Sequence, residues 1–264
     1  MKSRHQNSIG FFDSGIGGTT IWKKVNDLLP NENTIYLADS KNAPYGEKSK
    51  DEIIELSIKN TEFLLNHNVK IIVVACNTAT TNAIQVLRSK YSIPFIGIEP
   101  AIKPAGLITK TQRIGILATE RTLNSRLFEK TSEKLDPNII VIEQIGKGLV
   151  NLIEAGHIDT PEIQRLLNQY IQPMLQKNID TLVLGCTHYP YLIPEIKKII
   201  GKQIKIIDSS LAVAKQTKHV LDKYSLQNLE SKNKSTHLFF SNTCRPVLSK
   251  LLKNSSVKII EKTF

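Results

Sequence analysis

Short apolar runs alternate along the chain with longer stretches that carry apolar residues at helical spacing. The runs at 71–75 and 114–118 contain only apolar residues and glycine. Such runs are typical of strands buried on both faces of a parallel sheet. The stretches 51–66 and 161–176 instead place their apolar residues on one helical face. The pattern therefore predicts an α/β fold with helices on both faces of parallel sheets.

The predicted elements occur twice in the same order, which indicates an internal repeat. In each copy the order is strand, strand, helix, strand, helix, strand. The pairs are 9–14 and 114–119, 34–37 and 139–142, 51–66 and 161–176, 71–76 and 181–186, 83–88 and 192–200, and 95–98 and 204–207. We therefore expect two pseudo-symmetric, doubly wound parallel-sheet domains with the active site in the cleft between them.

The remaining tail contains a helix-like stretch at 211–221 and a strand-like stretch at 237–240. We expect this tail to pack back onto the first half. The predicted domains are then residues 1–98 together with 209–264, and residues 99–208.

Composition is ordinary for a folded enzyme, with 264 residues, 41% hydrophobic and 22% charged. No apolar run approaches the roughly 20 residues of a membrane span, and the first eight residues are polar. We therefore expect a cytoplasmic protein with no membrane partner. In that compartment the three cysteines are expected to be reduced thiols.

The formal net charge of +11 could attract nucleic acid or an anionic substrate. Lysines are nevertheless scattered, for example at 48, 50 and 59 and again at 197, 198 and 202, and no arginine-rich block occurs. The charge therefore favours a solvated basic surface over a nucleic-acid partner.

Two of the cysteines follow equivalent predicted strands, Cys76 in the first half and Cys186 in the second. A thiol between a strand and a helix N-terminus is expected to have a lowered pKa and to act as a base or nucleophile. A single cysteine beside a strand could equally be an inert core residue. The repetition favours function for this pair, whereas Cys244 lies in no such setting and is interpreted as structural or incidental.

Two thiols on opposite sides of a ligand could invert a stereocentre, because one base removes a proton and the other thiol returns one to the opposite face. The carbanion needs hydrogen-bond donors, which the side chains after the strands and the amides of the turn 15–18 could supply. The turn lacks the spacing of a dinucleotide or phosphate loop. It is interpreted as a carboxylate-binding turn or simply a tight one.

Five motifs together resemble the glutamate racemases of the aspartate/glutamate racemase superfamily. They are Phe-Asp-Ser-Gly-Ile-Gly-Gly at 12–18, Ala-Pro-Tyr-Gly at 43–46, Ala-Cys-Asn-Thr-Ala-Thr at 75–80, Pro-Ala-Ile-Lys-Pro-Ala at 100–105 and Gly-Cys-Thr-His-Tyr-Pro at 185–190. The resemblance implies interconversion of L- and D-glutamate without cofactor or metal, which supplies D-glutamate for peptidoglycan. The partner implied is the small-molecule substrate, and a homodimer is left open.

The resemblance also implies roles for individual residues. Cys76 and Cys186 are the two bases, assisted by Asp13, His188 and, in the segment 152–156, Glu154. The expected substrate contacts are Asp13, Ser14, Tyr45, Gly46, Asn77, Thr78, Thr187 and His188.

The chain departs from the family pattern at 119–122, where Thr-Glu-Arg-Thr replaces a sequence with glycine before the second threonine. Whether Thr119 and Thr122 line the site therefore stays open. The turn at 241–244 also departs from the commoner Gly-Asp form. Two other enzymes remain as alternatives: an aspartate racemase, and a thiol hydrolase that uses one cysteine with His188 as its base.

Overall fold

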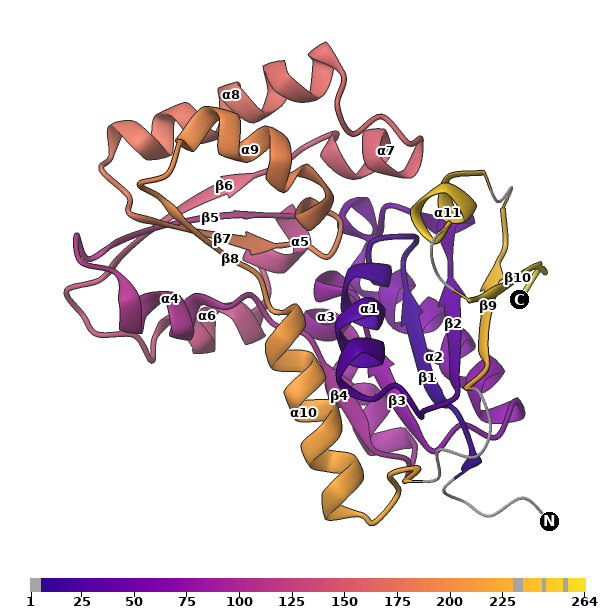
Figure 1. Ribbon diagram of the computed structural model, residues 1–264. Coiled ribbons are helices and arrows are strands. Elements are labelled where there is room, and N and C mark those ends of the chain that lie inside the picture. The colour runs from indigo at the N-terminus through magenta and orange to yellow at the C-terminus, as the bar shows by residue number, and fades with distance from the viewer. Residues whose placement is uncertain (1–5, 230–234, 244–245, 254–255) are drawn as a thin grey trace.

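The chain forms two separate parallel sheets in a computed structural model that describes residues 6–229, 235–243, 246–253 and 256–264 (Figure 1). The first sheet has the order β10-β9-β2-β1-β3-β4, and the second has the order β6-β5-β7-β8. The strands are β1 (Ile9–Asp13), β2 (Thr34–Ala38), β3 (Ile71–Val74), β4 (Phe95–Gly97), β5 (Arg113–Ala118), β6 (Ile140–Ile145), β7 (Thr181–Gly185), β8 (Lys205–Ile207), β9 (His237–Ser241) and β10 (Lys258–Glu261).

The predicted repeat is visible in the order of the strands. The four strands β2-β1-β3-β4 of the first sheet correspond in chain order and position to β6-β5-β7-β8 of the second, and all their pairings are parallel. Strands β1 and β3 are buried along their whole length, and apart from Asp13 at the end of β1 they contain only apolar residues and glycine. The predicted α/β fold class is confirmed.

Helices cover both faces of each sheet (Figure 1). In the first half α1 and α10 pack together on one face and α2 and α3 on the other; in the second, α8 and α9 lie opposite α4 and α6. The helices are α1 (Thr19–Leu28), α2 (Lys50–Asn66), α3 (Asn77–Lys90), α4 (Ile102–Ile108), α5 (Glu120–Leu123), α6 (Arg126–Ser132), α7 (Leu149–Glu154), α8 (Pro161–Gln176), α9 (Ile193–Ile200), α10 (Ser210–Lys223) and α11 (Pro246–Leu251). Three 3₁₀ turns complete the described elements: η2 (Ser40–Asn42), η3 (Tyr45–Glu47) and η4 (Tyr189–Leu192).

Local sequence explains where the long helices begin. Helix α2 starts at a capping box, in which the Ser49 hydroxyl accepts from the Glu52 amide and the Glu52 carboxylate accepts from the Ser49 amide. Helix α8 starts at Thr160, whose side chain caps it, with Pro161 in its first turn. Helix α3 begins six residues before the predicted stretch 83–88. The prediction began too late because the polar first turns of the helix lack the apolar spacing on which it rested.

The tail packs on the first sheet. Helix α10 packs against α1, and β9 pairs with β2 in a register that places Phe239 beside Tyr36. The Trp22 ring meets the Phe239 ring edge-on at 4.8 Å, which joins α1 to the tail strand. Strand β10, which the sequence analysis did not predict, extends this sheet beyond β9.

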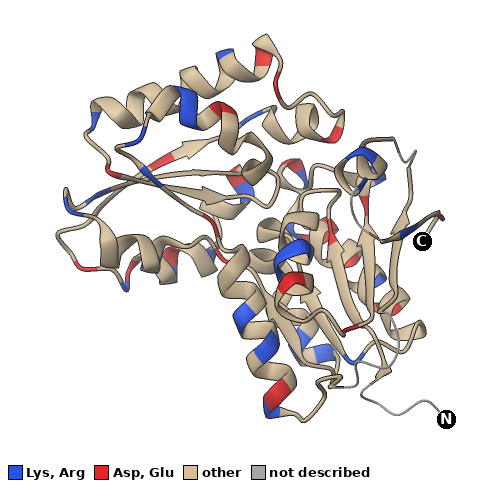
Figure 2. Cartoon of the chain, viewed as in Figure 1, with Lys and Arg blue, Asp and Glu red and all other residues tan. Residues whose placement is uncertain are grey.

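Charged residues are spread over both halves of the chain in Figure 2, with acidic residues among the Lys and Arg of the described part. None of the helices in the described ranges is long and apolar enough to cross a membrane.

A buried ion pair lies at the amino ends of strands β2 and β3. The Lys70 ammonium lies 2.5 Å from the Glu32 carboxylate, and the two side chains are 0% and 2% exposed. The other carboxylate oxygen of Glu32 accepts a hydrogen bond from the amide of Asn228, so the pair also fastens the tail. Burial lowers the pKa of Lys70, although the adjacent carboxylate opposes the change.

We expect Glu32→Gln to lower the free energy of unfolding by roughly 3 kcal/mol, because it leaves a buried ammonium without this carboxylate. Glu62→Gln is the matched control, since its ion pair with Lys90 spans 3.9 Å and both side chains are about half exposed. The control should cost less than about 1 kcal/mol. Urea unfolding measures both values, and equal losses would contradict a special role for the buried pair.

Candidate active site

Both cysteines lie at the carboxyl edge of a sheet, at the point where the strand order changes direction. In the first sheet Ser14 follows β1 and Cys76 follows β3; in the second, Thr119 follows β5 and Cys186 follows β7. Loops after neighbouring strands diverge at such a point and leave a crevice where ligands bind. The two crevices face each other.

A single small cavity contains both thiols. Its lining from the first half is Ser14, Pro44, Tyr45, Gly46, Cys76, Asn77 and Thr78, and from the second half Thr119, Val150, Cys186, Thr187 and His188. Its volume is about 10 Å³, room for roughly one water molecule. Every predicted site residue is in the lining except Asp13 and Glu154, which hydrogen-bond to Thr187 and His188 respectively.

Cys76 caps helix α3 and is 4% exposed. Its sulfur accepts a hydrogen bond from the Ala79 amide at 3.4 Å, and its thiol donates to Ser14 Oγ at 3.8 Å. Burial and the nearby Asp13 carboxylate nevertheless raise the pKa of Cys76 well above its usual value. The predicted lowering of the pKa is therefore wrong for Cys76, because desolvation of the thiolate outweighs the helix N-terminus.

Cys186 has a different environment. Cys186 follows β7 directly, but the next α-helix, α9, begins only at Ile193, so Cys186 does not lie at the start of a helix. Its hydrogen-bond partner is the side chain of His188. Cys186 Sγ lies 3.8 Å from His188 Nδ1, and His188 Nε2 lies 2.5 Å from Glu154 Oε1. Burial alone would lower the pKa of His188, but the hydrogen bonds to Cys186 and Glu154 raise it well above the usual value. The protonated ring donates to the thiol and to the carboxylate.

Glu154, at the end of α7, connects the two halves. Besides His188, its carboxylate accepts the Ile16 amide at 2.7 Å and the Ser40 hydroxyl at 2.9 Å. Gly17 packs so closely against the histidine that a Cβ there would lie 2.3 Å from Nδ1. The carboxylate and the glycine together fix the position of the imidazole from both sides of the cleft.

Asp13 is fully buried at the end of β1. Its carboxylate accepts the amides of Gly15 and Gly18 at 3.1 and 3.0 Å, and the Thr187 hydroxyl from the other half at 3.3 Å. Asp13 is not part of the cavity lining, so its contact with substrate stays a prediction. In the glycine-rich turn, the amides of Gly15 and Gly18 donate to Asp13 and the amide of Ile16 donates to Glu154.

A buried network positions the loop that carries Tyr45 and Gly46. The Tyr45 hydroxyl donates to the Asp39 carboxylate at 2.5 Å and accepts from the Asn60 amide at 3.1 Å. Asn242 of the tail also donates to Asp39, at 2.5 Å. Burial and the Asp39 charge raise the pKa of Tyr45 well above its usual value, so the phenol stays protonated as the donor. The sequence analysis assigned no role to Asp39.

Of the two threonines at 119 and 122, only the first lines the cavity. Thr119 lines the cavity, and its hydroxyl lies 2.8 Å from that of Thr78 and 2.9 Å from that of Thr122. Thr122 is fully buried and supports the other two without reaching the lining. Pro44 and Val150, which the sequence analysis also missed, complete the wall. Cys244, interpreted above as structural or incidental, lies outside the described residues.

Comparison with known proteins identifies the family. Residues 17–217 match the family described as Asp/Glu/Hydantoin racemase. The chain is 44% identical over 227 residues to a glutamate racemase from Ralstonia pickettii (strain 12J), which covers 86% of this chain and 80% of that relative. A glutamate racemase from Clostridium novyi (strain NT) is 43% identical over 234 residues, covering 88% and 90%. The chain belongs to the Asp/Glu/hydantoin racemase family.

Solved structures agree with this assignment. The racemase superposes on a glutamate racemase isoform from Bacillus anthracis with a TM-score of 0.88 at 31% identity, over 98% of both chains. A glutamate racemase from Francisella tularensis, in complex with D-glutamate, gives a TM-score of 0.84 at 31% identity, again over 98% of both chains. The resemblance drawn from the motifs is confirmed, and so is the predicted enzyme class.

The charge on Asp13 predicts a pH dependence of the racemase's stability. Burial raises the pKa of Asp13 from 3.8 to about 6, so between these values the folded state binds the proton more tightly than the unfolded state. Stability should therefore fall as pH rises from about 4 to 7. Relative to Asp13→Asn, which cannot ionise, the wild type should lose roughly 2 kcal/mol over this range.

Urea unfolding of both proteins at the two pH values measures the difference. Any hydrogen bonds that the asparagine changes affect both pH values alike, so they cancel from the comparison. A difference between the two proteins that does not vary with pH would show that Asp13 is not a buried, titrating carboxylate.

Proposed function

We propose that this racemase interconverts L- and D-glutamate by a two-base mechanism in which Cys76 and Cys186 are the bases. The observation that carries the proposal is that both thiols, at equivalent ends of two repeated sheets, line one cavity. The substrate is inferred from the relatives, which include a Francisella tularensis glutamate racemase in complex with D-glutamate and an Escherichia coli glutamate racemase in complex with L-glutamate.

In this mechanism one thiolate takes the proton from Cα, and the electron pair delocalises into the adjacent carboxylate. The opposite thiol then gives its own proton to the other face of Cα and becomes the thiolate. No atom is gained or lost overall, and the protonation states of the two cysteines have exchanged. The reaction in the other direction begins from that exchanged state.

The two thiols have different surroundings, which suits a pair that must start in opposite protonation states. Burial and Asp13 keep the pKa of Cys76 high, so Cys76 holds a proton at neutral pH. Cys186 instead faces the protonated ring of His188, with 3.8 Å between Sγ and Nδ1. On this account Cys76 is the proton donor in the first turnover.

Donors for the substrate carboxylates are available around the thiols. The Nδ2 group of Asn77 is buried in the cavity wall and has no hydrogen-bond partner among the described residues. A buried, unpaired amide is costly unless a ligand accepts from it. The hydroxyls of Ser14, Thr78 and Thr187 lie in the same lining. We infer that these groups hold the carboxylates and stabilise the negative charge that develops.

A cavity of about 10 Å³ is far smaller than an amino acid. Glutamate can enter only if the two halves separate or the loops between them move. We propose that residues 1–98 with 209–264, and residues 99–208, form the two domains that move apart. A closed cavity then excludes water from the carbanion.

The family resemblance suggests the cellular role. We propose that the enzyme works in the cytoplasm and supplies D-glutamate for peptidoglycan.

We expect Cys76→Ala and Cys186→Ala each to lower kcat/KM for both glutamate enantiomers by about a thousandfold or more, because each direction needs both thiols. Cys244→Ala is the matched control and should retain activity. Circular dichroism of glutamate incubated with each variant measures the rate. Full activity in either of the first two variants would overturn the two-thiol mechanism.

The same assay separates the alternatives. An aspartate racemase would act on aspartate in preference to glutamate. A thiol hydrolase would need Cys186 and His188 but not Cys76, and it would form an acyl-enzyme. We expect neither result.

A further inference from the structure

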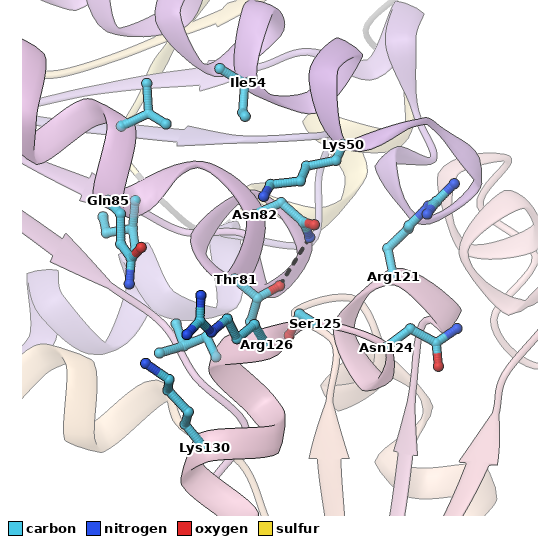
Figure 3. Close-up of a pocket in the computed structure, with 13 residues that line it drawn as sticks. Lys50, Ile54, Thr81, Asn82, Gln85, Arg121, Asn124, Ser125, Arg126 and Lys130 are labelled. Atoms are coloured by element: carbon cyan, nitrogen blue, oxygen red, sulfur yellow. Dashed lines mark hydrogen bonds between the residues drawn. The ribbon is translucent and has the colours of Figure 1, made fainter.

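A second hollow, separate from the cavity that holds the thiols, lies between helices α2, α3, α5 and α6. Its volume is about 430 Å³, a size typical of small-molecule sites. Its polar and charged lining is shown in Figure 3, and no residue lines both this hollow and the cavity of the thiols. We call it the basic hollow, after four of its lining residues: Lys50, Arg121, Arg126 and Lys130.

The charge in the basic hollow is entirely of one sign. The four cations line it together with neutral residues, and neither Asp nor Glu belongs to the lining. Across the described part of the chain, none of the four forms an ion pair. Arg121 Nε donates to the Lys48 carbonyl, which holds that side chain at the rim.

Three of the cations approach the same space from opposite sides. In Figure 3 Lys50 extends from the start of α2, whereas Arg126 and Lys130 extend from α6 across the hollow. Lys50 is also the first residue of α2, where the helix dipole disfavours a positive charge. Like charges that face one another in this way are not explained by the stability of the fold, and an anion between them would relieve the repulsion.

The neutral lining suits an organic anion. Thr81, Asn82 and Gln85 of α3 supply hydroxyl and amide groups, with the Asn82 amide held by the carbonyl of Thr78 at 2.9 Å. The apolar part of the lining consists of Ile54, Ile84, Val86 and Leu127. A guanidinium binds phosphate oxygens in a bidentate manner, and two lysines add point charges for a second anionic group.

We propose that the basic hollow binds a small molecule that carries a diphosphate, or two anionic groups at equivalent spacing, between Lys50 on one side and Arg126 and Lys130 on the other. Binding there does not depend on the racemase reaction proposed above.

Titration calorimetry of the full chain with inorganic pyrophosphate, at a fixed ionic strength of about 0.15 M, tests the proposal. We expect saturable binding of one pyrophosphate per chain, and weaker binding of inorganic phosphate. Arg126→Gln combined with Lys130→Gln should weaken pyrophosphate binding at least about tenfold. Lys50→Gln, on the opposite side of the hollow, should also weaken pyrophosphate binding. This variant replaces the double variant in the test if the double variant does not fold.

Lys197→Gln combined with Lys202→Gln is the matched control, because it removes the same charge from exposed positions on and just after α9. It should change the affinity by less than about twofold. The proposal is overturned if pyrophosphate does not saturate at millimolar concentration, if phosphate binds as tightly, or if the control weakens binding as much as the double variant. The last result would indicate attraction to the general positive charge of the chain.

Discussion

The Glu154 carboxylate joins the two halves at the thiols, because it reaches from the second half to the first. It accepts from the Ile16 amide and the Ser40 hydroxyl on one side and from His188 on the other. Asp13 makes the reverse connection, from the first half to the Thr187 hydroxyl. A buried carboxylate, Asp13, and a partly buried one, Glu154, thus join the loops that carry the thiols, and several donors satisfy each of them.

These connections also make a symmetric fold chemically asymmetric. The four strands β2-β1-β3-β4 of the first sheet correspond to β6-β5-β7-β8 of the second, and each crevice contains a cysteine. The surroundings differ, however, because Cys76 lies near a carboxylate and Cys186 near an imidazolium. A repeated fold supplies two thiols at matching positions, and the unrepeated residues around them give each thiol different surroundings.

The sequence predicted the sheets well because burial on both faces leaves an unambiguous apolar run, as in β1 and β3. Strand β10 was missed because its half-exposed residues carry no such pattern. The cysteines were found through the repeat, but the pKa of Cys76 was not, since desolvation depends on what packs around the sulfur. Asp39 and Ser40 were assigned no role for a related reason: their partners, Tyr45 and Glu154, meet them only in the folded chain.

The central claim is that two thiols act on opposite faces of one carbon, and isotope exchange during the first turnovers in D₂O tests it most directly. The thiols exchange with solvent, so the account predicts that L-glutamate yields D-glutamate carrying deuterium at Cα, while the unreacted L-glutamate keeps its protium. A single base would return the abstracted protium to either face. Product that keeps protium, or deuterium that appears equally early in the remaining substrate, would contradict the account.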